Sequence, residues 1–371
     1  MTNRVCLLGP DPANGSYSTF NYYCACATEL RRFVGDIRVE ARNPAGRGGY
    51  WAQTDSRAIV WGRDYLLWPL RLMGMKGSAY HIMDQGLAWY SKVLGRGVRL
   101  VTVHDLIAYM TYSRDLPFAK LSWRMEALVL ECMREIARAE HVFAISECTA
   151  SALMKHLKVK CTKITVTPNF AQKVFHLCPD SVRAAARARF FGETEFVIVC
   201  VASGAEYKNR SGALRALFVL KQKFPDVQLH IAGGNTSKVE GAIIRELNLA
   251  HNVHYWGVLP LDELVLFYNG ADALICPSIY EGFGLPPLEA MQCGCPVAAT
   301  SCGSVKEVVG DAALTVESPT AYEEMARCLE EVLRNRTLRR NLQSLGLRRA
   351  SHFNVRNSMQ GIADVYKRLL A

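Results

Sequence analysis

Two carboxylates frame the loop of this chain that is best equipped for chemistry. Glu281 and Glu289 enclose the residues GFGLPPL, which follow the apolar, strand-like stretch 273–277. Two prolines at a strand-to-helix junction favour a helix that starts near Pro287, with Glu289 on its first turn. Unpaired N–H groups at such a helix start attract an anion such as a phosphate. We therefore expect a phosphate-bearing ligand whose hydroxyl groups donate hydrogen bonds to the two carboxylates.

This segment resembles the Glu-x7-Glu motif of the retaining, family-4 glycosyltransferases of GT-B fold. The flanking residues are similar to that family's as well, at 278–280, at 290–297 with its Gly-x-Pro-Val, and at 301–309. The resemblance implies an α/β protein of two Rossmann-like, doubly wound domains that face each other across a cleft. It also implies a hexosyltransferase whose donor is a nucleoside diphosphate sugar.

Length and composition are those of a globular, soluble, two-domain enzyme. The 371 residues exceed the size at which one hydrophobic core usually stops growing, and half of them are hydrophobic. The first residues read as a buried strand rather than a signal peptide, and no run is long enough for a membrane span. We expect the thirteen scattered cysteines to be buried thiols in a reducing cytoplasm. Cys293 and Cys295 stand too far from other ligand types to indicate zinc.

Positive charge is concentrated in the first half of the chain. Residues 1–175 contain 23 Lys and Arg against 14 Asp and Glu, a net charge of +9, whereas residues 176–371 have a net charge of +1. This excess favours an anionic partner such as a membrane surface, a phosphorylated lipid or nucleic acid. A solvated basic surface without a specific partner explains the excess equally well. The basic residues are dispersed rather than clustered with aromatic ones, which argues against nucleic acid.

Short apolar segments alternate with helical patterns through both halves, as in doubly wound α/β domains. We expect an acceptor-binding domain at 1–172 and a nucleotide-sugar-binding domain at 173–352. In the resembled family, the last helix, here 353–371, crosses back to the first domain. The expected strands are 5–8, 100–103, 142–145, 164–166, 196–201, 229–231, 253–256, 273–276, 296–299 and 314–316, and long helices are expected at 17–33 and 121–139.

Lys208, after the first strand of the second domain, is similar to the lysine with which this family grips the donor diphosphate. A cation there offsets the negative charge that the leaving diphosphate gains; the alternative is a surface lysine that opens a helix. Many family members have an arginine a few residues upstream, where this chain has Ala202, Ser203 and Ala205. Ser203 and Gly204 could donate hydrogen bonds in its place, or Arg210 could reach in.

The resemblance assigns the remaining donor contacts to strand ends. Glu281 orients the donor sugar, Glu289 holds the ribose, and the strand ends with Gly233 and Val258 line the base. Tight-turn glycines explain the Gly233 segment structurally. The residues expected to hold the diphosphate beside Lys208 are Gly282, Phe283, Gly284 and Leu285.

The first domain offers three candidate positions. Gly15 and Ser16 lie in a strand-to-helix loop and would bring N–H groups toward the donor, although a helix N-cap at Asn14 or Ser16 explains them nearly as well. His104 ends a strand and resembles the family's histidine over the donor sugar; alone it would be read as a structural histidine. Ser146 is interpreted as a helix N-cap.

Residues 63–76 mix aromatic and aliphatic side chains with Arg63, Arg71 and Lys76. This composition suits an element that dips into lipid headgroups. Pro69 should interrupt any long helix here, and core packing is the expected role of most of the apolar residues.

We expect a retaining hexosyltransferase that transfers mannose from GDP-mannose to a lipid-linked oligosaccharide or an exopolysaccharide intermediate. It should act in the cytoplasm or peripherally at the inner membrane face. The sequence contains no Asp-x-Asp, consistent with a reaction that needs no metal. UDP- and dTDP-sugars share the scaffold. Alternatives are an α-glucan or sucrose-type synthase with a soluble acceptor, a noncatalytic scaffold subunit of a polysaccharide assembly complex, and a nucleic-acid-modifying transferase.

Overall fold

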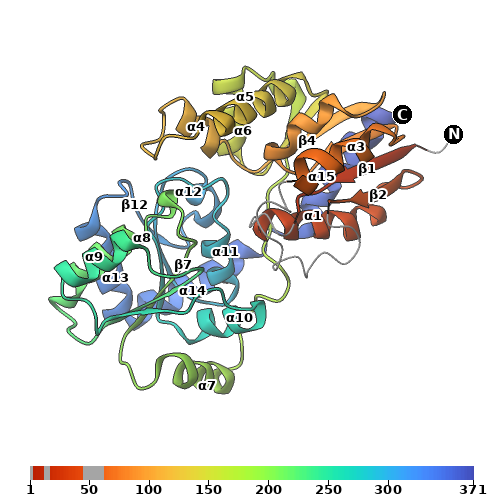
Figure 1. The fold of residues 1–371 in the computed structure, drawn as a ribbon. Coiled ribbons are helices and arrows are strands. Elements are labelled where there is room, and N and C mark those ends of the chain that lie inside the picture. The colour runs from red at the N-terminus through yellow and green to blue at the C-terminus, as the bar shows by residue number, and fades with distance from the viewer. Residues whose placement is uncertain (1–2, 12–16, 45–61) are drawn as a thin grey trace. The chain divides into compact units, whose positions relative to one another are not determined.

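The protein is described by a computed structural model that covers residues 3–11, 17–44 and 62–371. It divides into two compact units: Met1–Asn169 with Val355–Ala371, and Phe170–Asn354 (Figure 1). The first boundary lies three residues before the expected one at 172, and the second lies two residues after the expected one at 352.

The first unit contains a six-stranded, wholly parallel sheet in the order β2-β1-β3-β4-β5-β6. Its strands are β1 (Arg4–Leu8), β2 (Arg38–Arg42), β3 (Ala79–Ile82), β4 (Val98–Val103), β5 (His141–Ala144) and β6 (Ile164–Val166). Its helices are α1 (Tyr17–Glu29), η2 (Leu30–Arg32), η4 (Arg63–Leu67), α3 (Trp68–Met73), η5 (Gln85–Lys92), α4 (Ile107–Tyr112), α5 (Trp123–Arg138), α6 (Glu147–Leu157), η6 (Cys161–Lys163) and α15 (Val355–Leu370).

The sequence did not predict β2 and β3. The β2 strand alternates Arg38, Glu40 and Arg42 with small apolar residues, and this charge suits its place at the edge of the sheet. The β3 strand is fully buried, but it contains His81, whose ring nitrogens lie 2.5 Å from the hydroxyl of Tyr366 and 2.7 Å from that of Thr102. A buried polar side chain with its partners far along the chain hides the strand pattern.

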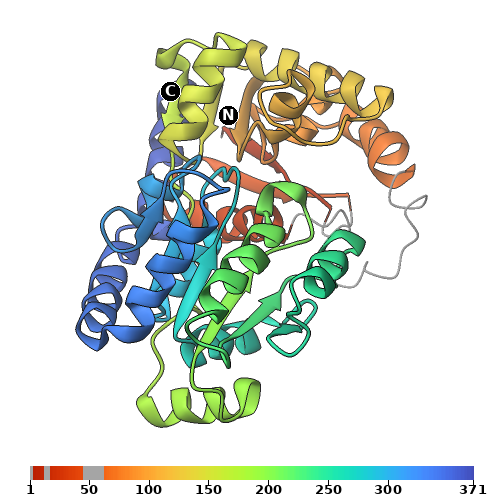
Figure 2. The same cartoon turned by 90° about the vertical axis from the view of Figure 1, so that its left-hand side faces the viewer.

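The second unit contains another six-stranded parallel sheet, in the order β12-β11-β10-β7-β8-β9, with helices on both sides (Figures 1 and 2). Its strands are β7 (Val197–Val201), β8 (Gln228–Ala232), β9 (Val253–Tyr255), β10 (Ala273–Cys276), β11 (Val297–Thr300) and β12 (Leu314–Val316). Its helices are α7 (Asp180–Phe191), η7 (Glu206–Lys208), α8 (Arg210–Lys221), α9 (Lys238–Glu246), α10 (Leu261–Gly270), α11 (Leu285–Gln292), α12 (Val305–Val309), α13 (Tyr322–Arg334) and α14 (Arg336–Ala350).

The strand order of the second unit reverses between β7 and β10. This is the order of the dinucleotide-binding Rossmann sheets, in which ligands bind outside the carboxyl ends of the strands at the reversal point. The predicted alternation of strands and helices in this half is confirmed. The carboxyl ends of β7 and β10 are therefore where a ligand site is expected.

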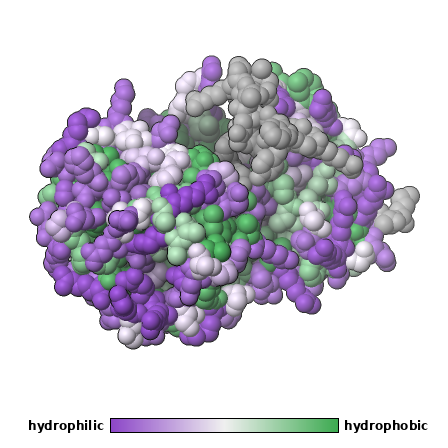
Figure 3. Space-filling model, turned by 90° about the horizontal axis from the view of Figure 1, so that it is seen from below, coloured by the Kyte–Doolittle hydropathy of each residue, from purple (hydrophilic) through white to green (hydrophobic). Residues whose placement is uncertain are grey.

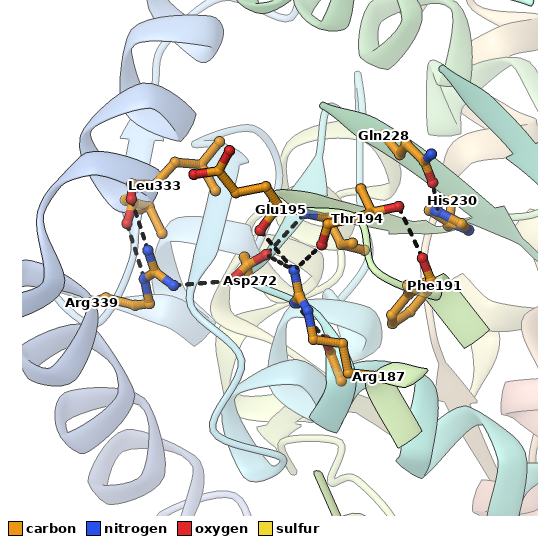
Figure 4. Close-up of polar contacts among 12 residues, drawn as sticks. Arg187, Phe191, Thr194, Glu195, Gln228, His230, Asp272, Leu333 and Arg339 are labelled. Atoms are coloured by element: carbon orange, nitrogen blue, oxygen red, sulfur yellow. Dashed lines mark hydrogen bonds and ion pairs between the residues drawn. The ribbon is translucent and has the colours of Figure 1, made fainter. Parts of the chain in front are cut away.

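At the opposite, amino ends of the same two strands, Asp272 ties three segments together (Figure 4). Its carboxylate accepts a hydrogen bond of 2.9 Å from the backbone N–H of Val197, and it pairs with Arg187 at 3.0 Å and with Arg339 at 2.9 Å. Arg187 also donates to the carbonyl of Glu195, and Arg339 to that of Leu333, so α7 and α14 are fixed to the sheet.

The last helix, α15, belongs to the first unit and is labelled among its elements in Figure 1. It packs against α1, η2 and β6. The amide of Asn3 donates to the carbonyl of Leu370 at 2.5 Å, and the hydroxyl of Ser358 donates to the carbonyl of Pro168. All thirteen cysteines lie in the described part of the chain and are free thiols. No helix in that part is long and apolar enough to cross a bilayer.

Replacing Asp272 with alanine should destabilise the second unit, because two arginines and one N–H lose a partly buried acceptor. We expect a loss of about 2–4 kcal/mol in the free energy of unfolding, measured by urea denaturation. Asp311→Ala is the control, since Asp311 is fully exposed and 3.9 Å from Lys306, and it should unfold like the wild type. Equal midpoints for Asp272→Ala and the wild type would contradict the role given to Asp272.

Candidate functional site

The structure brings Lys208 and Glu281 together at the carboxyl ends of β7 and β10. Lys208 ends η7, just after β7, and its Nζ donates to Oε1 and Oε2 of Glu281 at 2.9 and 3.0 Å. The side chains are only 15% and 7% exposed, so the ion pair is almost entirely out of water. Burial alone would lower the pKa of Lys208, but the carboxylate of Glu281 outweighs it and raises that pKa.

The position of Glu281 is fixed through its main chain. Its carbonyl oxygen accepts hydrogen bonds of 3.1 Å from both the N–H and the hydroxyl of Ser304. Gly303 has a φ of +57°, and a Cβ there would lie 2.4 Å from the same oxygen, so only glycine fits. The hydroxyl of Ser278 donates to Oε1 of Glu281 at 2.7 Å. A carboxylate held in this way is preorganised to bind a ligand.

The loop between the two glutamates leads into α11. The helix begins at Leu285 rather than at Pro287, and Gly284 adopts a φ of +99° before it. Pro286 and Pro287 have no N–H, while the N–H groups of Phe283, Gly284 and Leu285 have no hydrogen-bond partner among the described residues. Three free N–H groups at the positive end of a helix can bind an anion.

Glu289 lies at the fifth position of α11, at the start of its second turn, so its expected place on the first turn was wrong. The hydroxyl of Tyr268 donates to its Oε2 at 3.0 Å. Burial raises the pKa of Glu289 to about 7, against the hydrogen bond from Tyr268 and the charge of Lys208, which both lower it. The carboxyl group thus titrates near neutral pH.

The other predicted residues of this unit lie after β7 and after two further strands, β8 and β9. Ser203 and Gly204 follow β7, Gly233 follows β8, and Val258 lies after β9 with 82% of its surface exposed. The N–H of Gly233 donates to the carbonyl of Gly257 at 2.6 Å, which joins the ends of β8 and β9. With Lys208, Glu281 and Glu289, these residues share one edge of one sheet.

Arg210 does not replace the missing upstream arginine, contrary to one of the sequence alternatives. Its guanidinium is 1% exposed and pairs with both carboxylate oxygens of Glu240 at 2.6 and 2.7 Å. It also donates to the carbonyls of Asn235 and Ala202 and lies over the ring of Tyr255. Through these contacts Arg210 connects the carboxyl ends of β7, β8 and β9.

His104 lies in the first unit, at the end of β4, and is 6% exposed. Its ring Nε2 is 3.0 Å from the carbonyl of Met83, and the ring meets that of Tyr22 edge-on. The backbone N–H of His104 donates to the side-chain oxygen of Gln85. Burial lowers the pKa of His104, so the ring is neutral near pH 7 and Nε2 carries the proton given to Met83. Nδ1 is then an acceptor.

Ser146 caps α6 by accepting a hydrogen bond from the N–H of Thr149, which confirms its predicted role. Gly15 and Ser16 lie outside the described residues. In the described part of the chain, no cluster of His, Cys, Asp and Glu could hold a metal ion.

Sequence reasoning missed the residues that support the site: Ser278, Ser304, Tyr268 and Glu240. Ser278 stands three residues before Glu281, and Ser304 lies in the segment 301–309 that resembles the family's. Their positions in the sequence could therefore have identified both as candidates. Tyr268 and Glu240 contact residues 21 and 30 positions away, and a single sequence carries no signal for such pairs.

Solved structures decide the fold. The chain superposes on sucrose-phosphate synthase from Thermosynechococcus elongatus with a TM-score of 0.77, at 19% identity and over 99% of both chains. It superposes on HepE from Anabaena, solved with UDP and glucose, with a TM-score of 0.74, at 16% identity and over 98% and 99% of the two chains. The fold is GT-B.

Residues 182–348, in the second GT-B unit, match the family "Glycosyl transferases group 1". The chain is 25% identical over 285 residues to the serotype-specific mannosyltransferase WbdA of Escherichia coli, across 72% of this chain and 33% of WbdA. It is 37% identical over 117 residues to O-antigen chain mannosyltransferase B of the same organism, across 32% and 30% of the two chains. The chain thus spans about a third of the length of these relatives. The second unit is therefore similar to glycosyltransferases, and the fold of the chain is that of GT-B proteins.

The raised pKa of Glu289 predicts a pH dependence of stability. Between pH 4.5 and about 7, the folded carboxyl group keeps a proton that the unfolded chain releases, so stability falls as the pH rises through this range. Glu289→Gln should lose less thermal stability than the wild type between pH 5 and pH 8. Glu193→Gln, at an exposed position, should follow the wild type. Parallel wild-type and Glu289→Gln curves would exclude this titration.

The pair of Arg210 and Glu240 predicts strong thermodynamic coupling. Arg210→Met and Glu240→Gln each leave a buried charge without its partner, and each should cost about 3–5 kcal/mol in the free energy of unfolding. The double variant should be more stable than the sum of the two losses predicts, with a coupling energy of about 2 kcal/mol or more. Additive losses in a double-mutant cycle would refute the pairing.

Proposed function

We propose that this protein is a retaining glycosyltransferase that transfers a hexose from a nucleoside diphosphate sugar to a hydroxyl group of a glycan. The ion pair of Lys208 and Glu281 at the reversal point of a Rossmann sheet carries this proposal. A cation beside free helix N–H groups suits a diphosphate, and an anchored carboxylate suits sugar hydroxyls. The match of residues 182–348 to the glycosyl transferases covers this same site.

Each residue has a defined task in the proposed reaction. Lys208 and the N–H groups of residues 283–285 hold the diphosphate, Glu281 orients the sugar, and Glu289 accepts hydrogen bonds from the ribose. The bond between the anomeric carbon and the phosphate oxygen breaks, and its electron pair leaves with the diphosphate. The acceptor oxygen bonds to the same face of the sugar and passes its proton to the departing phosphate oxygen. No protein nucleophile is needed, and retention follows from same-face attack.

Lys208 supplies positive charge where the negative charge of the leaving group develops. We infer that no metal ion is required, since the ammonium and the start of α11 can both stabilise the diphosphate. His104, neutral and buried, would position the donor sugar through its Nδ1 acceptor. The ion pair is intact and buried, and Ser278 and Ser304 hold Glu281 in place, which argues against a noncatalytic scaffold.

The donor we propose is GDP-mannose, because two of the relatives are mannosyltransferases by name. The acceptor we propose is a lipid-linked oligosaccharide or an exopolysaccharide intermediate at the inner membrane face. The name of one relative, an O-antigen chain mannosyltransferase, supports a polysaccharide acceptor. The net charge of +9 in residues 1–175 is consistent with an anionic membrane nearby.

A panel of GDP-mannose, UDP-glucose and dTDP-glucose tests the donor by thermal stabilisation and by transfer to a glycan acceptor. GDP-mannose should raise the melting temperature selectively. Lys208→Ala should abolish this shift, and Lys208→Ala or Glu281→Ala should slow transfer by about 10²-fold or more. Lys223→Ala removes an exposed lysine of the same unit and should leave transfer unchanged.

Different outcomes overturn different parts of the proposal. A selective shift with UDP-glucose would replace GDP-mannose as the donor and leave the transferase standing. Full transfer by both the Lys208 and Glu281 variants would refute the roles given to the ion pair.

A further inference from the structure

An apolar helical face of the first unit is turned to solvent. Four large side chains of η4 and α3 are exposed: Leu66 by 56%, Leu67 by 56%, Leu70 by 63% and Met73 by 58%. The sequence assigned most apolar residues of 63–76 to the core. That expectation is wrong for these four, while Trp68, Pro69 and Leu72 on the same elements are buried.

The exposed residues form one continuous face. Leu67 and Trp68 both have right-handed helical φ and ψ, so η4 runs directly into α3. Pro69 does not break the helix, contrary to expectation: the π-helical turn η4 lies directly before it, and there the N–H of Trp68 donates to the carbonyl of Arg63. Leu66, Leu70 and Met73 are spaced by four and three residues, which places them on one side. We call residues 66, 67, 70 and 73 the apolar face.

The other side of the same segment is anchored in the first unit. Trp68 and Leu72 join the hydrophobic core, and the ring of Tyr65 stacks on that of Trp89 at 5.8 Å with an angle of 3°. Arg63 pairs with the buried carboxylate of Asp11, which lies three residues after β1. The apolar face therefore belongs to a fixed element and is not the frayed end of a helix.

Positive charge accompanies the apolar face. Arg71 stands between Leu70 and Met73 in the sequence, Lys76 follows Met73 by three residues, and both are exposed. No Asp or Glu occurs from residue 65 to residue 83. A short helix with exposed Leu and Met on one side and basic residues at its edge has the chemistry of a segment that lies in the headgroup region of an anionic bilayer.

Single exposed apolar side chains are ordinary, and four together are not. On the side of the molecule shown in Figure 3, hydrophilic side chains predominate and apolar ones form small groups among them. A second copy of the chain is a poorer occupant of the apolar face, because a twofold contact would bring Arg71 and Lys76 of both copies together.

We propose that the apolar face docks on an anionic lipid bilayer, with Leu66, Leu67, Leu70 and Met73 at the boundary of the acyl chains and Arg71 and Lys76 beside lipid phosphates. The inference rests on the proposed function in one respect: a lipid-linked acceptor would lie in the membrane on which the apolar face docks. Vesicle binding can be measured without donor or acceptor, so its failure is distinguishable from a failure of transfer.

The test is co-sedimentation of the full chain with vesicles of phosphatidylcholine alone and of phosphatidylcholine with phosphatidylglycerol. The wild type should bind the anionic vesicles, and less so at high salt. Leu70→Glu should weaken binding by about tenfold or more, because it puts a charge into the apolar face. Arg71→Ala with Lys76→Ala should weaken binding to anionic vesicles by about tenfold and change binding to neutral ones little.

Val182→Glu is the matched control, since Val182 is an exposed apolar residue, 39% exposed, on the first turn of α7 in the second unit. It adds the same charge, and a glutamate suits the start of a helix. This variant should bind vesicles like the wild type. The proposal is overturned if the wild type stays in the supernatant with both kinds of vesicle, or if Leu70→Glu binds as the wild type does. A change of oligomeric state in Leu70→Glu with unchanged vesicle binding would assign the face to a second copy instead.

Discussion

The buried ion pair between Lys208 and Glu281 is the interaction on which the carboxyl edge of the second sheet depends. At the reversal point the connections after β7 and β10 diverge to opposite faces of the sheet, and this pair bridges them. Neither charge could remain buried without the other. A lysine ammonium has three N–H donors, and two of them go to the oxygens of Glu281, which leaves one for a ligand. A diphosphate can therefore be bound without breaking the pair.

The two central strands are held at both ends by charge. Asp272 with Arg187 and Arg339 fixes the amino ends of β7 and β10, while the Lys208 pair joins their carboxyl ends. Between these two ends the strands are apolar and parallel, and all their residues except the partly exposed Val201 are buried. A ligand site between loops needs such support, since the loops themselves have few hydrogen bonds to fix them. Part of the rigidity of the candidate site thus comes from Asp272, Arg187 and Arg339, which lie at the opposite ends of these strands from Lys208 and Glu281.

Local sequence predicted most of the strands and helices and named the candidate residues at the carboxyl edge of the second sheet, but it did not predict the contacts that support them. The strands of the second half were visible because parallel strands are continuous apolar runs, and GFGLPPL marks a strand-to-helix junction by its glycines and prolines. Arg210 was read as a possible phosphate ligand because a surface arginine and a buried one look alike in sequence. Its partner Glu240 is 30 residues away and reads as a capping-box glutamate, a role it also has. The exposure of Leu66 and Leu70 was hidden for a similar reason, since apolar periodicity does not reveal which side of a helix the core covers.

The commitment of Arg210 to Glu240 sets how the second unit can stabilise a diphosphate. With that guanidinium saturated, charge must come from Lys208 and from the start of α11. Pro286 and Pro287 remove two N–H donors from the first turn, so the helix offers the three N–H groups of residues 283–285. These N–H groups follow Glu281 by only two to four residues. A ligand with a phosphate and a sugar a few bonds apart matches this division of charge, whereas a simple phosphate would add no partner to the carboxylate, which already binds Lys208 and Ser278.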